Sequence, residues 1–461
     1  MRSGSRREKG ERAYPLCLWD VIGGEFGVPS RAVEKGSTAS RVDSMTGGQA
    51  EDAGPPEVAF VVPAGRGAPR SSSLPGVRRH PSKPTCILHL GMPKTGTSSI
   101  QDSLYFGLED PAYRYISLGH TQASLTVPAC FVDQPQDFWV FRMLGFSKLE
   151  VQRMQASHLR RLRRALVRAR GRRQTPILST EHCWVLPSAA LDRLRAFLES
   201  EGFHVAGIVY VRPIKSWLES FFQQRNKWKK IAFQPFQMRP APGNCPDYFY
   251  AEKLVALAET FGRENLTVRT FVGSNLKSNC AVQDFCESVG IHLSPDSIIR
   301  SNDSLSADAT RLLYAYNHFC DSSAQDHLTR RSVLARHLES LKGPPLRFHS
   351  SVFQPIETLI ESQNRTLRDD YGVDISEDLK AHDEGDSVRE AKDLFRFPGA
   401  LLEWLAEASD SRVFPVGGGE AAARDVAVQM NRLYRRPLWG ALWDLGQEKI
   451  RTKARWIRKG D

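Results

Sequence analysis

The stretch that decides the fold is LHLGMPKTGTSSIQ, residues 88–101. It runs from an apolar, strand-like segment through a turn of Gly and Pro into a helical pattern. In this arrangement the backbone amides of residues 95–99 point outward at the start of a helix and form a concave site for an anion. The turn therefore predicts a bound phosphate or a phosphate-like group.

This loop differs from the Walker A motif of ATPases and GTPases. That motif reads G-x-x-x-x-G-K-[ST], so a lysine follows its second glycine. Here Thr97 follows Gly96, and the lysine comes earlier, as Lys94. The sequence disfavours an ATPase or GTPase, and a P-loop kinase or nucleotidase is kept as the alternative enzyme class.

Apolar runs rich in β-forming residues alternate with helical periodicity on the carboxyl side of residue 84. Near-continuous apolar strands joined by amphipathic helices are typical of a parallel sheet covered on both faces. After about residue 300 the strand signals fade and helices dominate. We predict an α/β fold of about five parallel strands with helices on both faces, completed by a helical C-terminal layer. The runs expected to be strands are residues 86–90, 113–116, 176–179, 205–211 and 266–271.

The composition along the chain predicts three parts. Residues 1–82 are rich in Gly, Ser, Pro, Arg and Glu and lack a sustained apolar period, so we expect a disordered N-terminal extension. The α/β domain with its helical part is expected over residues 83–415. Residues 416–461 mix Trp and Leu with Arg and Lys and are expected to form a basic, aromatic tail, with peripheral membrane contact as its alternative role.

The charge and the cysteine content limit the classes of ligand and of metal site to be considered. Lys and Arg number 63 against 52 Asp and Glu, a formal net charge of +11 in 461 residues, which favours anionic ligands. None of the eight cysteines forms a C-x-x-C pair, so a zinc ribbon is not indicated. Neither a run of about 18 apolar residues nor a signal-like N-terminus is present. We expect a soluble, cytoplasmic protein with reduced thiols.

Two motifs resemble the sulfotransferases that use 3′-phosphoadenosine-5′-phosphosulfate (PAPS). The string from Pro93 to Ser98 resembles their 5′-phosphosulfate loop, a modified P-loop with an early lysine. The second motif ends a strand at residues 209–213, and Ser220 follows Arg212 by eight residues in a predicted helix. The resemblance implies that Arg212 and Ser220 bind the 3′-phosphate of PAPS. A guanidinium and a hydroxyl two helical turns on can converge on one phosphate.

Downstream segments extend the resemblance to roughly residues 84–375. Residues 249–254, 261–268, 284–286 and 302–306 resemble elements that follow in carbohydrate-type bacterial members of the family. One departure is Val272, since the family often has an acidic residue after the position of Phe271. The resemblance implies a P-loop fold and sulfuryl transfer to a hydroxyl, or less readily an amine, of a carbohydrate or glycoconjugate.

The resemblance also implies roles for the site residues. Lys94 would neutralise the charge that grows on the leaving 5′-phosphate, and no metal is expected. An acceptor hydroxyl needs a general base, for which Glu181 is the first candidate and His182 the competitor. Both follow a predicted strand, at the edge where open α/β sheets place ligands. The loop donors would be Thr95, Gly96, Thr97, Ser98 and Ser99.

Plain structural roles are the alternatives for these residues. Arg212 could form a salt bridge at a strand end, and His89 is expected to be a packed core histidine. The arginine-rich run at residues 160–173 is expected to be a helix with a solvated basic face, its alternative being contact with a polyanionic acceptor or membrane headgroups. Nucleic acid is not an expected partner, because the strands do not gather aromatics among basic residues on one face of the sheet. A non-catalytic nucleic-acid-binding or membrane-binding protein stays as the third hypothesis.

Overall fold

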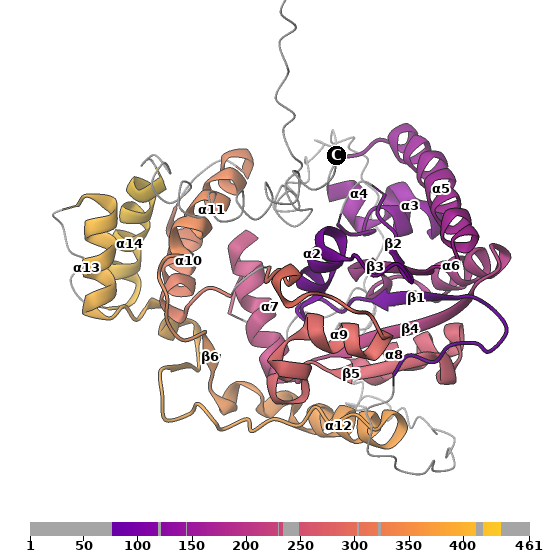
Figure 1. Ribbon diagram of the computed structural model, residues 1–461. Coiled ribbons are helices and arrows are strands. Elements are labelled where there is room, and N and C mark those ends of the chain that lie inside the picture. Colours follow the sequence, from indigo (N-terminus) through magenta and orange to yellow (C-terminus); the bar gives the residue numbers. More distant parts are fainter. Residues whose placement is uncertain are drawn as a thin grey trace, which may run out of the picture. The chain divides into compact units, whose positions relative to one another are not determined.

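The computed structural model describes residues 76–118, 121–143, 145–228, 230–233, 249–301, 304–320, 324–411 and 418–434. Five strands form one sheet in the order β2-β3-β1-β4-β5, and every neighbouring pair is parallel (Figure 1). All five predicted strands are present, and the predicted α/β fold is confirmed. The strands are β1 Thr85–Leu90, β2 Tyr113–Tyr115, β3 Thr175–Thr180, β4 His204–Val211 and β5 Leu266–Thr270.

Helices cover both faces of the sheet, which explains why the strands read as continuous apolar runs. All six residues of β1 are buried. Ile87 belongs to a core cluster with Ile100 of α2 and Phe285 of α9, whereas its neighbour Leu88 belongs to a second cluster with residues of α5, α6 and α8. This alternation is the two-residue period of a strand. The helices are α2 Thr97–Gly107, α3 Thr126–Phe131, α4 Trp139–Met143, α5 Lys148–Gly171, α6 Ser188–Ser200, α7 Ile214–Trp228, α8 Tyr250–Phe261 and α9 Ala281–Val289.

The central strand β1 lies between β3 and β4, so the loops that follow these three strands share one edge of the sheet. Leu90 pairs with Thr180 at this edge, and β4 ends beside it at Val211. The helices that follow β1 and β3 pack on opposite faces, α2 with one core cluster and α6 with the other. A crevice at such a switch point is where open α/β sheets bind ligands.

Helices dominate the C-terminal part, as predicted. α10 packs against α7 of the α/β part and against α14, and two short parallel strands, β6 and β7, pair nearby. The elements are α10 Ala307–Phe319, α11 Ala324–Leu338, β6 Arg347–Phe348, α12 Glu357–Tyr371, β7 Ser387–Val388, α13 Gly399–Ser409 and α14 Gly419–Tyr434.

The packed part of the chain extends beyond both predicted limits. Val426 and Met430 of α14 are fully buried, although residue 415 was the expected end of the domain. At the other end, the amide of Val77 donates to the carbonyl of Ser288 at 2.9 Å, ahead of the expected start at residue 83. Residues 1–75 and 435–461, on which the predicted disorder and most of the predicted tail fall, lie outside the described residues.

Candidate active site

The turn between β1 and α2 has the backbone of an anion-binding loop. Gly96, the N-cap of α2, has a φ of 77°, in the left-handed region that favours glycine. A Cβ at this position would lie 3.0 Å from the Cβ of Ala281 and 3.0 Å from the ring of Phe271. The amide of Ile100 donates to the Gly96 carbonyl at 3.1 Å. The amides of residues 97–99 precede this bond, and such positions have no acceptor within an α-helix.

Carbonyl groups of the loop accept hydrogen bonds that fix its conformation. The Thr95 hydroxyl donates to the carbonyl of Met92 at 2.7 Å, and the Thr97 hydroxyl donates to the same oxygen at 3.3 Å. The indole Nε1 of Trp217, on α7, donates to the carbonyl of Pro93 at 3.0 Å. These contacts fix the conformation of the loop.

Three of the four hydroxyl groups predicted as ligand donors therefore serve the fold. Besides Thr95 and Thr97, Ser99 accepts a hydrogen bond from the amide of Ser301 at 3.0 Å, which ties α2 to the segment after α9. Ser98 and Ser99 are half-buried. What these residues offer an anion is the backbone N–H of the first helical turn.

Lys94 stands among charged groups from three parts of the sheet edge. Its ammonium donates to Oε1 of Gln224 on α7 at 3.3 Å. The pKa of Lys94 is lowered to about 8, chiefly by loss of hydration and also by the nearby cations Lys227 and Arg212, whereas Glu181 acts in the opposite direction. The lysine is thus cationic at neutral pH but poised to lose its proton just above it.

This poise predicts a pH dependence. Anion binding at the loop should weaken as pH rises through about 8, because a lysine with this pKa is charged below it and neutral above it. We expect the dissociation constant of 3′,5′-ADP to rise severalfold between pH 7 and pH 9 in titration calorimetry. A Lys94→Met variant should lose this dependence. An equal dependence in both proteins would assign the titration to another group.

Arg212 and Ser220 line one cavity. Ser220 is 5% exposed, and Arg212 is half-buried, with a pKa lowered by that burial. Arg212 also donates from Nη1 to the carbonyl of Lys94 at 3.2 Å, so one guanidinium joins the cavity to the loop. The cavity measures about 240 Å³ and is lined by Arg212, Ser216, Glu219, Ser220, Gln223, Ser304, Leu305, Gly343, Pro345, Leu346 and Arg347.

The opposite wall of this cavity comes from the C-terminal part and supplies a second guanidinium. Arg347 of β6 donates from Nη1 to Glu219 Oε2 at 2.8 Å, and the amide of Phe348 donates to Glu219 Oε1 at 2.9 Å. Burial raises the pKa of Glu219, and these two bonds oppose the rise. Sequence reasoning missed Arg347, because it lies far along the chain from Arg212 and no motif surrounds it.

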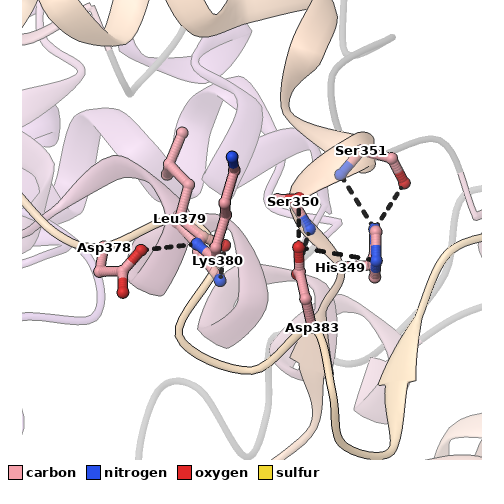
Figure 2. Close-up of polar contacts among 8 residues, drawn as sticks. His349, Ser350, Ser351, Asp378, Leu379, Lys380 and Asp383 are labelled. Carbon is pink, nitrogen blue, oxygen red and sulfur yellow. Dashed lines mark hydrogen bonds and ion pairs between the residues drawn. The ribbon is translucent and has the colours of Figure 1, made fainter.

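One segment after α12 holds the two walls together. Glu377 accepts hydrogen bonds from the amide of Ser216 at 3.2 Å and from the hydroxyl of the same residue, at the start of α7. Further on, Asp383 accepts from the amide of Ser350 at 2.8 Å and pairs with His349 at 3.6 Å, just after β6 (Figure 2). The segment therefore fixes the position of Arg347 relative to α7.

Glu181 lies directly beside the loop. It opens a short 3-10 helix, Glu181–Trp184, at the carboxyl end of β3, and only 7% of the residue is exposed. A Cβ on Gly91 would lie 3.1 Å from the Cα of Glu181, so only glycine lets the two backbones approach this closely. The effect of Glu181 on the pKa of Lys94 places the carboxylate within electrostatic reach of the ammonium.

His182 is more enclosed than its neighbour. Its Nδ1 donates to the carbonyl of Ser124, which leaves the lone pair on Nε2. The rings of Phe138 and Trp139 stand edge-on to the imidazole at centroid distances of 5.7 and 5.4 Å. Burial lowers the pKa of His182 to about 4, so the ring is neutral at physiological pH.

The sequence also gives expectations for His89, metal ligands and membrane-spanning helices. His89 is fully buried between Tyr210 and Phe285, and burial lowers its pKa to about 3, as expected for a core histidine. Within the described ranges, no three His, Cys, Asp or Glu side chains gather as a metal site would need. No helix in these ranges is both long and apolar enough to cross a bilayer.

Comparison with known proteins gives a slight likeness in structure. No family model matches the chain, and no curated protein matches it. Among solved structures, the crystal structure of a sulfotransferase from Alicyclobacillus acidocaldarius matches with 14% identity and a TM-score of 0.29, over 57% of this chain and 97% of that chain. A likeness of this size assigns no activity, and the residues of the site must supply the function.

Proposed function

We propose that the protein transfers a sulfuryl group from PAPS to a hydroxyl group, or less readily an amine, of a carbohydrate or glycoconjugate. One observation carries this proposal. Arg212 lines a cavity with Ser220 and also bonds to the backbone of the loop that carries Lys94. Adenosine 3′,5′-bisphosphate suits such a site because it carries phosphates at two separate positions of its ribose, whereas the phosphates of ATP and GTP form one chain.

Helix α7 runs along both ends of this site. Ser220 and Gln224 are four residues apart and so lie on one face of the helix, about 6 Å apart along its axis. Ser220 lines the cavity, whereas Gln224 accepts a hydrogen bond from Lys94. A nucleotide bound along this face would place its 3′-phosphate near Arg212 and its 5′-phosphate near Lys94.

The chemistry follows from these positions. PAPS supplies a sulfuryl group activated by its link to the 5′-phosphate. As the acceptor oxygen attacks sulfur in line, the S–O bond to that phosphate breaks and 3′,5′-ADP leaves. Lys94 neutralises the charge that develops on the leaving phosphate, and the amides of residues 97–99 hold the same group. Glu181 accepts the proton that the acceptor hydroxyl loses.

Glu181 is the proposed base, with His182 as the competitor. His182 has its Nδ1–H fixed by Ser124, and its pKa near 4 makes it about as weak a base as an ordinary carboxylate, so basicity does not separate the two candidates. Glu181 stands beside the loop, within the field of Lys94. We therefore favour Glu181, whose backbone adjoins the loop at which the transferred group would bind.

A Glu181→Gln variant tests this assignment. Turnover should fall about 10²- to 10⁴-fold, the usual contribution of a general base, while the affinity for 3′,5′-ADP stays within about twofold. The assay follows labelled sulfate from PAPS to a panel of carbohydrate acceptors. His182→Gln is the matched control, and if it alone slows turnover the base is the histidine. Absence of both transfer and 3′,5′-ADP binding in the wild-type protein would overturn the proposed function.

A further inference from the structure

The solvent face of α5 carries a line of arginines. Between residues 151 and 180 the sequence contains neither Asp nor Glu. Leu162 and Leu166 are buried against the core, so the opposite face of the helix is directed to solvent. The exposed arginines of α5 and the turn that follows are Arg153, Arg160, Arg161, Arg163, Arg164, Arg168, Arg170, Arg172 and Arg173.

Their spacing places several of them in one row. Arg160, Arg164 and Arg168 follow one another at intervals of four residues, and Arg153 lies on the same side two turns earlier. At 1.5 Å per residue, the row from Arg153 to Arg168 is about 22 Å long. This is the length of an extended site for a linear ligand, not of a pocket for a small one.

The exposed arginines of α5 are only partly neutralised by the protein itself. Arg163 pairs with Glu201 at 2.6 Å, and Arg170 donates to the carbonyl of Glu201 at 2.8 Å. Among the described residues, no ion pair engages Arg160, Arg164 or Arg168. Like charges four residues apart repel each other along a helix. Repulsion within the row therefore opposes helix formation, and a bound anion would relieve it.

The shape of α5 favours a soluble polyanion over a membrane. Interfacial helices insert an apolar face between lipid headgroups. The apolar face of α5 is already committed to the core, and its exposed large apolar side chains are only Leu149 and Val167. The helix also contains no Phe, Tyr or Trp on which nucleic-acid bases could stack.

Helix α5 is connected through α3 to the surroundings of the two candidate bases. Thr126 of α3 bonds to His158 of α5 at 3.1 Å, and the carbonyl of Ser124, just before α3, accepts from His182. Trp139 of α4, shortly before α5 in the chain, is 41% exposed and stands against the His182 ring. An exposed aromatic ring with an apolar face is suited to packing against a sugar ring.

We propose that the solvent face of α5 binds the acidic groups of an extended anionic polysaccharide. Guanidinium groups pair bidentately with carboxylate and with sulfate-like oxyanions, so a linear chain with regularly spaced acidic groups can follow the row. The idea that this polysaccharide is also the acceptor rests on the proposed function. The binding of the polysaccharide to α5 is independent of the proposed function.

The test compares two variants that each remove four positive charges. In the first, Arg160, Arg161, Arg164 and Arg168 are replaced by Gln; in the control, four exposed arginines on other elements are replaced, namely Arg78, Arg365, Arg389 and Arg432. The probes are immobilised heparin and hyaluronan, with neutral dextran, single-stranded oligo(dT) and phosphatidylserine vesicles for comparison. We expect the α5 variant to bind both acidic polysaccharides at least about tenfold more weakly than the wild-type protein, and the control to change by less than about threefold.

Several results would overturn the proposal: equal losses in the two variants, equal binding to dextran, or stronger α5-dependent binding to oligo(dT) or to vesicles. Circular dichroism and thermal unfolding of the same samples show that they are folded, and binding of 3′,5′-ADP is measured separately. If the fourfold variant does not fold, the double variants Arg160→Gln/Arg164→Gln and Arg161→Gln/Arg168→Gln replace it, with the same expected order of affinities. If the wild-type protein binds 3′,5′-ADP but no acidic polysaccharide, only the proposal for α5 is contradicted. If it binds the polysaccharide but not 3′,5′-ADP, only the proposed function is contradicted.

Discussion

Replacement of Lys94 by Ala or Met should reduce sulfuryl transfer from PAPS at least about 10²- to 10³-fold, the effect of removing one preorganised donor to a developing charge. The Lys94 ammonium is buried near other cations, and both effects hold its pKa near 8. No second lysine is in the loop to replace it. Because the charge on the leaving phosphate grows only as the S–O bond breaks, kcat should fall more than the affinity for 3′,5′-ADP.

The Met variant keeps the length of the side chain and removes only the charge, so it separates electrostatics from packing. Lys392→Met, at an exposed lysine paired with Glu390, is the matched control and should retain wild-type turnover. Steady-state rates with labelled PAPS, together with 3′,5′-ADP affinities, measure both effects. Transfer at near wild-type rate in the Met variant would contradict the role of Lys94.

The fold could be predicted from the sequence because it depends on local patterns. A strand buried on both faces must be apolar at nearly every position, and the run around Ile87 and Leu88 shows this directly. The helical C-terminal part was predicted in the same way. The limits of the domain were not, because Val77 and Met430 are held by tertiary contacts with distant elements, and neither stands in a pattern that shows its partner.

In the candidate site, too, the residues within local motifs could be predicted, whereas those brought in by tertiary contacts could not. The loop and the pair of Arg212 and Ser220 lie within short stretches whose spacing alone brings them together, and the structure places both residues in one cavity. Gln224 lies in the same helix, but nothing in the sequence indicates that it meets Lys94. Arg347 reaches the cavity only through the fold of the C-terminal part. The hydroxyl of Thr95 has an internal partner that no motif reveals.

The second large effect is expected at Arg212. Replacement by Ala should weaken binding of 3′,5′-ADP about 10- to 100-fold, the value of a charged hydrogen bond of roughly 1.5–3 kcal/mol. Affinity for 5′-AMP should change far less, because 5′-AMP has no 3′-phosphate for the cavity. Arg212→Lys keeps the charge but not the planar guanidinium, so its affinity for 3′,5′-ADP should lie between those of the wild-type protein and Arg212→Ala. Arg365→Ala, at an exposed arginine of α12, is the control and should bind both nucleotides as the wild-type protein does.

Calorimetric titration of 3′,5′-ADP and 5′-AMP into the wild-type protein and Arg212→Ala tests the central claim most directly. The account predicts that the wild-type protein prefers 3′,5′-ADP and that the substitution removes most of this preference. Equal losses for the two nucleotides, or no preference in the wild-type protein, would show that the cavity beside Arg212 does not hold a 3′-phosphate.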